Sequence, residues 1–113
     1  MSDIEQEIQD KGLTAPRVTP TDLQDNISAD FYFTAADPFL GREVISCNDE
    51  AHLSLLTFCV LVLKNGFTVT GESACASPEN FDAEIGRKIA RQNAEQKIWP
   101  LMGYALKQKL SEA

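Results

Sequence analysis

The sequence is poor in the residue types on which most enzyme and metal sites depend. Its 113 residues contain one histidine, His52, and three cysteines, Cys47, Cys59 and Cys75, with no close pair. No serine or cysteine has an obvious partner base nearby, which argues against a histidine-dependent hydrolase. The histidine and the cysteines also lack the short spacings that zinc ligands have. Three is an odd number of cysteines, which favours reduced thiols. We therefore expect a protein that is not an enzyme and that has no metal site and no cofactor.

Positive charge and long apolar runs are also scarce. Ten lysines and arginines stand against 17 aspartates and glutamates, a formal net charge of -7. This balance opposes binding to duplex nucleic acid, which requires many cations on one face. The longest apolar run, residues 53–63, is about half the roughly 20 residues of a membrane span, so we expect a buried strand. Residues 1–13 lack a secretory signal pattern. A cytosolic protein that binds neither duplex nucleic acid nor a membrane is expected.

The length predicts a single domain, residues 1–113, of the α+β class. Residues 1–30 are expected to form a segment of short helices, at 4–11 and 20–29. Residues 31–76 are expected to form an antiparallel sheet with a central hairpin, in which 31–34 is a strand and 35–50 has loop composition. Residues 77–113 are expected to form the C-terminal helices. Because a core of this size gains from assembly, we also expect a homo-oligomer.

Asn65-Gly66 is the clearest local signal in the chain. A two-residue type I′ turn needs positive φ at both positions, which these residue types tolerate. That turn would place Val62 opposite Val69, with the core on one face. The predicted core face is Phe58, Val60, Val62, Phe67 and Val69. The other face mixes apolar and polar residues. We expect it to be a subunit interface, a ligand wall or a surface covered by the N-terminal segment. Its residues are Cys59, Leu61, Leu63, Thr68, Thr70 and Glu72.

The main helix carries two stripes of side chains and one proline. It is predicted to begin at residues 77–78, where serine caps and proline fits the first turn. Phe81, Ile85 and Ile89 recur every four residues and are expected to pack on the sheet. A second stripe consists of small residues, Ala83, Gly86, Ala90 and Ala94. These are either simply good helix formers or a contact for another helix, which would explain a glycine that costs roughly 1 kcal/mol. Pro100 is expected to kink or break the helix.

Cations gather on this helix in an otherwise acidic chain. Arg87 and Arg91 lie one turn apart and could hold one or two phosphates in forked contacts. Lys97 adds charge on another side of the helix. The alternative is that the arginines form exposed salt bridges with Glu84 and Glu95. The helix is thus a candidate anion site, with the salt-bridge alternative open.

Three further residues are candidates for ligand contacts. Asn80 offers an amide for a base edge, and the Phe81 ring could stack on a base, although it could also be plain core. Arg17 is a cation near a helix N-terminus, or simply a solvated loop residue. The candidate ligand-binding residues are therefore Arg87, Arg91, Asn80, Phe81, Lys97 and Arg17.

Three stretches of the chain carry a resemblance to known proteins. They are GLTAPRVTP, FYFTA and FCVLVLKNGFTVTGESACASPENFDAEIGRKIARQNAEQKIWPLMGY. They resemble small tailed-phage proteins of a family of unknown function, and the layout of helix, hairpin and C-terminal helices resembles the phage Thoeris anti-defence proteins of the first described type. The resemblance implies a hexameric homo-oligomer in the host bacterial cytoplasm. It would sequester cyclic ADP-ribose isomers made by TIR-domain proteins without cleaving them.

The resemblance extends to other signals and leaves rival functions open. Related members also hold the cyclic oligonucleotides of CBASS defence, so the implied partners are cyclic nucleotide signalling molecules and further copies of the chain. An acidic phage protein could instead bind and inhibit a host protein through its negative surface. A nucleotide-processing enzyme is a third possibility. The six candidate residues follow from their own chemistry and not from the resemblance.

Overall fold

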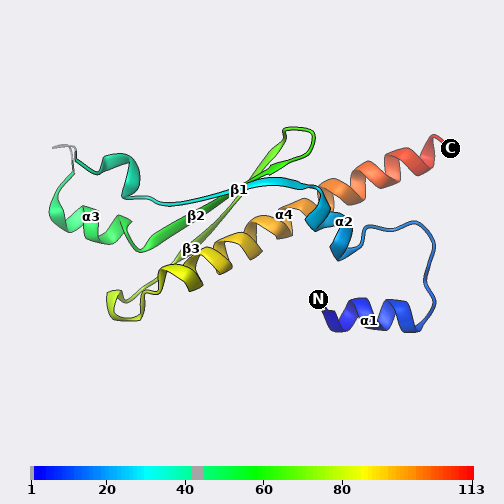
Figure 1. The fold of residues 1–113 in the computed structure, drawn as a ribbon, viewed down its shortest axis with the longest axis horizontal. Helices are drawn as coiled ribbons and strands as arrows, with labels where there is room; N and C mark the ends of the chain where they lie inside the picture. Colours follow the sequence, from blue (N-terminus) through cyan, green and yellow to red (C-terminus); the bar gives the residue numbers. More distant parts are fainter. Residues whose placement is uncertain (1, 42–44) are drawn as a thin grey trace.

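The computed structural model describes residues 2–41 and 45–113 and has an α+β fold, as predicted (Figure 1). Its elements are α1 (Ser2–Asp10), α2 (Pro20–Asp25), β1 (Ile27–Thr34), η1 (Asp37–Phe39), α3 (Cys47–Leu53), β2 (Leu56–Leu63), β3 (Thr68–Ala74), η2 (Pro78–Asn80) and α4 (Ala83–Ser111). The strands form one antiparallel sheet in the order β1-β2-β3. Helix α4 crosses one face of this sheet and continues beyond it.

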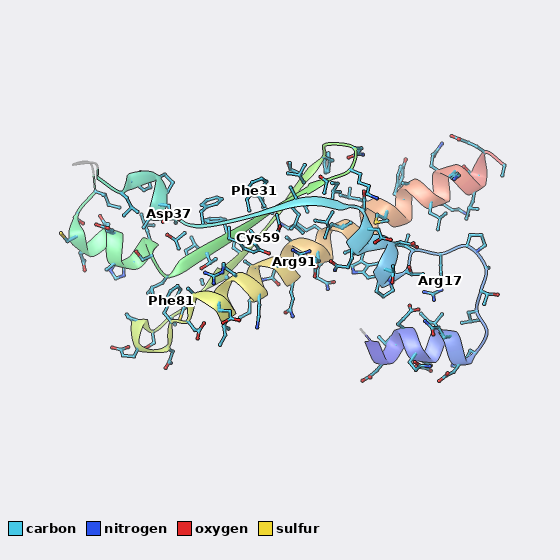
Figure 2. All side chains as sticks on the ribbon, viewed as in Figure 1. Arg17, Phe31, Asp37, Cys59, Phe81 and Arg91 are labelled. Carbon is cyan, nitrogen blue, oxygen red and sulfur yellow. The ribbon has the colours of Figure 1, made fainter. Side chains whose placement is uncertain are left out.

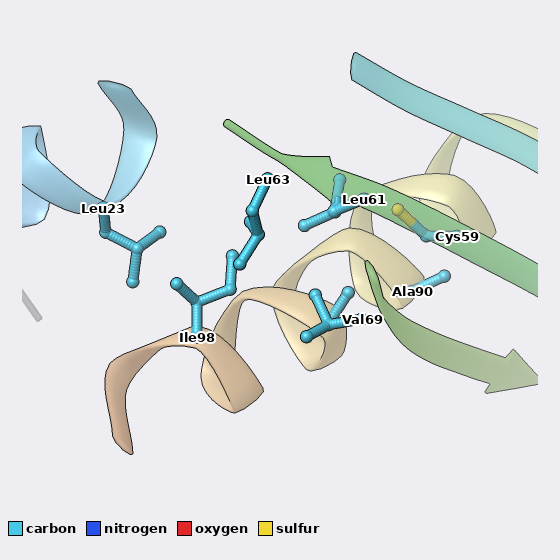
Figure 3. Packing of buried hydrophobic residues seen from close by; sticks show 8 residues of the cluster. Leu23, Cys59, Leu61, Leu63, Val69, Ala90 and Ile98 are labelled. Carbon is cyan, nitrogen blue, oxygen red and sulfur yellow. The ribbon is translucent and has the colours of Figure 1, made fainter. Parts of the chain in front are cut away.

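The core lies between α4 and the sheet (Figure 3). Its buried residues are Leu23, Cys59, Leu61, Leu63, Val69, Ala90, Ala94 and Ile98. The helix approaches β3 so closely that a Cβ added at Gly71 would collide with the backbone of Ala90 and Ala94. Only small side chains fit at this contact, because any larger group would push the helix away from the strand.

This close approach reverses the prediction for the two stripes of α4. The small residues Gly86, Ala90 and Ala94 are buried against the sheet of the same chain, so they are not a contact for another helix. Ile85 and Ile89, predicted to pack on the sheet, are 55% and 42% exposed. The physical reason is Gly71, whose missing side chain lets the small stripe come closer than the isoleucines could.

The predicted hairpin is present, but its loop has three residues instead of two. The Gly66 N–H donates to the Leu63 carbonyl at 2.8 Å, and the Leu63 N–H donates to the Phe67 carbonyl at 2.8 Å. Gly66 has φ of 89°, whereas Asn65 does not have positive φ. A four-residue turn that ends in a left-handed glycine is the usual form of a three-residue hairpin loop.

The extra loop residue shifts the strand register by one position. Leu61, not Val62, pairs with Val69. A shift of one residue exchanges the two faces of a strand, so the predicted core face was wrong for Phe58, Val60 and Val62 of β2, whereas Val69 of β3 is buried as predicted. Cys59, Leu61 and Leu63 are buried under α4, while the intervening residues Phe58, Val60 and Val62 lie on the opposite face, only half-buried.

Element boundaries differ from the predictions at several points. Helix α2 ends at Asp25, so β1 begins at Ile27 and not at residue 31. The expected loop at 35–50 contains η1 and the first part of α3, which continues to Leu53, and its residues 42–44 lie outside the described residues. Helix α4 begins after Asp82, whose side chain accepts from the Ile85 N–H at 3.0 Å. Residues 77–78 lead into η2 instead.

Pro100 does not break α4, which is helical from Ala83 to Ser111. The proline removes one backbone donor, but it is exposed on the helix surface. The carbonyl of Gln96 can therefore turn toward solvent, so the loss of its helical partner is tolerated. Of the two outcomes expected at Pro100, the break was therefore wrong, and residues 83–111 form one helix instead of several.

Candidate functional site

A small cavity opens between β1 and the first turns of α4. Its volume is about 150 Å³. Its lining residues are Tyr32, Phe33, Thr34, Asp37, Thr57, Phe81, Ala83 and Arg87. Two candidate ligand-binding residues from the sequence, Phe81 and Arg87, thus line one cavity, and Asn80 precedes Phe81 in the chain.

Local packing explains why these side chains meet. Gly86 lies directly over β2, where an added Cβ would be 3.1 Å from the Thr57 hydroxyl oxygen. This contact brings the first turns of α4 onto the sheet and places the next residue, Arg87, at the β1 side. Phe81 is half-buried at the end of η2, where its N–H donates to the Pro78 carbonyl at 3.2 Å.

Arg91 occupies a polar cluster next to this cavity, between α4 and β1 (Figure 2). Its guanidinium forms ion pairs with Asp30 at 3.0 Å and Glu95 at 3.1 Å. It also donates to the Gln24 amide oxygen at 3.2 Å and to the Tyr32 hydroxyl at 3.4 Å. The predicted salt bridge of Arg91 with Glu95 is therefore present, although it is part-buried and not exposed, and an incoming phosphate would have to displace a carboxylate.

Tyr32 connects the cluster with the cavity. Burial raises the pKa of its hydroxyl, a change that the Arg91 hydrogen bond partly offsets. The hydrogen bond to Tyr32 is also the main reason that the pKa of Arg91 lies above its usual value. Burial raises the pKa of Cys59, the residue paired with Tyr32 across the strands. At neutral pH the site therefore presents a charged guanidinium, a neutral phenol and a neutral thiol.

Arg17 lies at the other end of the molecule from Phe81 (Figure 2). Its guanidinium donates two hydrogen bonds to the Glu5 carboxylate, at 2.8 and 2.7 Å. It lines a separate groove of about 440 Å³, to which Asp22 and Asp25 also contribute. Two carboxylates make that groove less suitable for an anion than the cavity at Arg87.

Lys97 is exposed on α4, ten residues after Arg87 and thus about 15 Å further along the helix. The structure therefore brings Arg87, Phe81 and Asn80 to one end of the sheet, with Arg91 in the adjoining polar cluster. It does not bring Arg17 or Lys97 to them.

Four polar residues of the cavity were not predicted from the sequence: Tyr32, Thr34, Asp37 and Thr57. Alternation within the strand FYFT could have placed Tyr32 and Thr34 on one face. Asp37 is engaged by Thr34, whose N–H and hydroxyl donate to its carboxylate at 2.8 and 3.1 Å. The side chains could hold an anionic group at Arg87 beside a flat ring at Phe81.

In the parts of the chain that the structure describes, no three histidine, cysteine, aspartate or glutamate side chains lie together where they could hold a metal ion. None of the described helices has both the length and the apolar composition of a membrane span.

Comparisons with known proteins identify the family. No curated protein and no solved structure matches the chain significantly. A family model matches residues 18–110, which include the sheet, η2 and nearly all of α4. The chain belongs to the Phage protein (N4 Gp49/phage Sf6 gene 66) family.

Proposed function

We propose that this phage protein sequesters cyclic nucleotide signals of bacterial immunity in the host cytoplasm and releases them unchanged. The ligands would be cyclic ADP-ribose isomers from TIR-domain proteins, with CBASS cyclic oligonucleotides as further candidates. The resemblance to Thoeris anti-defence proteins, which also implies a hexamer, suggested this function. The observation that carries it is the shared cavity of Arg87 and Phe81.

The charge partners of the cations favour Arg87 as the phosphate contact. Arg17 and Arg91 form ion pairs with carboxylates, and exposed Lys88 pairs with Glu84 at 3.3 Å. Arg87 forms no ion pair with a residue in the described ranges, 2–41 and 45–113. A guanidinium that is not already paired can bind phosphate with two parallel hydrogen bonds and without first releasing a carboxylate.

Phe81 and Asn80 fit the other parts of a nucleotide. A phenyl ring can stack on adenine, and an exposed carboxamide can both donate to and accept from a base edge. The cavity of about 150 Å³ is smaller than the roughly 300–1,000 Å³ of a typical small-molecule site. In this proposal the cavity holds one phosphate or one ring, and the rest of the ligand extends along η2.

The chemistry of the site supports binding without cleavage. Hydrolysis of a phosphodiester or glycosidic bond needs a placed acid or base, as well as an activated nucleophile. Cys59 is buried and its pKa is raised, so it is a poor nucleophile at neutral pH. Asp37 is the acid of the cavity, and its carboxylate already accepts two hydrogen bonds from Thr34.

A calorimetric panel tests this function. Cyclic ADP-ribose isomers and cyclic di- and trinucleotides would each be titrated into the protein, and bound ligand would be recovered after denaturation for mass spectrometry. We expect submicromolar binding of at least one ligand and recovery of its unchanged mass. Absence of heat with every ligand would contradict the proposal, and recovery of a cleaved product would indicate an enzyme.

The acidic surface supports a second candidate, inhibition of a host protein. The net charge is -7, and the exposed helix α1 carries Asp3, Glu7 and Asp10. A negative surface can occupy the nucleic-acid-binding cleft of a basic protein. Affinity capture from a host lysate would then recover one bacterial protein in stoichiometric amount. If Lys replacements of these three acids leave that capture unchanged, the charge-based explanation is wrong.

A further inference from the structure

The face of the sheet opposite α4 is apolar and uncovered. Figure 2 shows Phe31 projecting from β1 away from α4, and this side chain is 57% exposed. The Phe33 ring stacks on Phe58 with 5.3 Å between centroids. The residues of this outer face are Ala29, Phe31, Phe33, Leu56, Phe58, Val60, Val62, Thr68, Thr70, Glu72 and Ala74. The structure describes every residue of β1 and β2, and none of those on the outer face is charged.

The chain as a whole also exposes more surface than a compact monomer of its mass. The chain exposes 7903 Å², whereas a compact monomer of its mass exposes about 6200 Å². Its radius of gyration is 18.2 Å, against roughly 13 Å for a compact domain of this length. Helices α1 and the end of α4 contribute to the excess. The excess of about 1700 Å² belongs to the whole chain and is about twice the approximately 800 Å² that each partner buries in a standard interface, so burial of the outer face would remove only part of it.

We infer that a second copy of this chain covers the outer face, with the two sheets packed face to face around a twofold axis. Sheets pack about 10 Å apart by interdigitating apolar side chains, and the aromatic and β-branched rows of β1 and β2 provide them. Both copies carry a charge of -7, so the contact must avoid the acidic residues. Glu72, the one acid of the face, lies on the edge strand β3, where it can remain at the solvated rim.

Charge also argues against other occupants of the outer face. A nucleic acid or a basic protein would find one carboxylate and no cation in the three strands of this face. A twofold contact instead uses the same apolar patch on both sides, which is the commonest arrangement of soluble dimers. The inference concerns how copies meet, and it holds whether or not a nucleotide binds at Arg87.

Two exposed phenylalanines on opposite faces allow a matched test. Phe31 lies on the outer face. Phe67, which is 54% exposed, accepts a hydrogen bond at its carbonyl from the Leu63 N–H, and the residue lines a groove with Leu101 and Met102 of α4. Wild type, Phe31→Glu and Phe67→Glu would be compared by analytical ultracentrifugation, with circular dichroism to confirm folding. The wild type and Phe67→Glu should have twice the mass of 12.5 kDa or a larger even multiple. Phe31→Glu should raise the dissociation constant of the sheet contact at least about 100-fold, because it buries an unpaired carboxylate.

Several outcomes would overturn the inference. A monomeric wild type at micromolar concentration would do so, as would Phe31→Glu with the mass of wild type. Equal loss of mass in Phe31→Glu and Phe67→Glu would show that the effect is not specific to the outer face. If Phe31→Glu does not fold, Val60→Thr places a hydroxyl on the same face with little change of shape. This variant should weaken association about tenfold, and unchanged association would also refute the inference.

Discussion

Replacement of Gly71 by alanine is the sharpest test of how α4 sits on the sheet. The added Cβ would collide with the Ala90 carbonyl oxygen and with the backbone of Ala94. Both are helix backbone atoms, so no flexible side chain can move aside, and α4 itself must shift. Overpacking of a core typically costs about 1–3 kcal/mol, and we place Gly71→Ala at about 3 kcal/mol or more. For a chain of this length the midpoint of thermal unfolding should fall by roughly 12 °C.

Gly103 is the matched control. It lies within α4, and nothing would lie within 4 Å of a Cβ added there. Gly103→Ala should increase the free energy of unfolding by about 0.5–1 kcal/mol, because alanine favours the helix. Chemical denaturation of both variants at one protein concentration measures the two changes and avoids shifts caused by assembly. A Gly71→Ala variant as stable as wild type would refute the close packing, and with it the position of Arg87 beside β1.

Two further predictions concern ionisable groups. The Arg17 hydrogen bond lowers the pKa of Glu5 from 4.5 to about 2, so this pair stabilises the protein above about pH 4.5 and loses that effect as the pH falls through about 2. NMR titration should show the low pKa of Glu5 in wild type and a higher pKa in Arg17→Ala, in which only the Gln9 hydrogen bond still lowers it; an equally low value in the variant would contradict the assignment. For the thiols, iodoacetamide should modify exposed Cys47 in the native protein and buried Cys59 only after unfolding, as followed by peptide mass spectrometry. Rapid native modification of Cys59 would show that the core beneath α4 is open.

The hairpin shows how far local sequence signals reach. Asn65-Gly66 correctly predicts a turn between two strands, but the same dipeptide fits loops of two or three residues. The choice depends on the φ of Asn65, and one residue of register determines which face of β2 is buried. Both faces of β2 are apolar, so hydrophobic alternation could not settle that choice.

The helix stripes could not be assigned without the sheet. Periodicity correctly predicts that one side of α4 is buried, and large apolar residues are ordinarily the better choice for that side. Here Gly71 on β3 admits the helix so closely that Gly86 and Ala90 fit and Ile85 does not. This constraint comes from a strand distant in the sequence, and helical periodicity contains no information about it.

The part of the candidate site that lies in α4 and in the residues just before it was predictable from the sequence. Phe81 lies just before α4 and Arg87 lies in its second turn, six residues later, so their proximity follows from a short separation in the sequence. The Glu95 partner of Arg91 is likewise four residues away. Asp30 and Tyr32 reach the same guanidinium from β1, through a register that the sequence alone leaves undetermined.

Calorimetric titration of cyclic ADP-ribose isomers into wild type, Arg87→Ala and Lys88→Ala tests the proposed site most directly. Lys88 is the control because it is the adjacent residue of α4, carries the same charge and forms an exposed pair with Glu84. We predict that Arg87→Ala weakens binding at least about tenfold, through loss of a charge-assisted contact to phosphate, while Lys88→Ala binds as wild type does. Equal affinity of Arg87→Ala and wild type for a ligand that wild type binds would contradict the account.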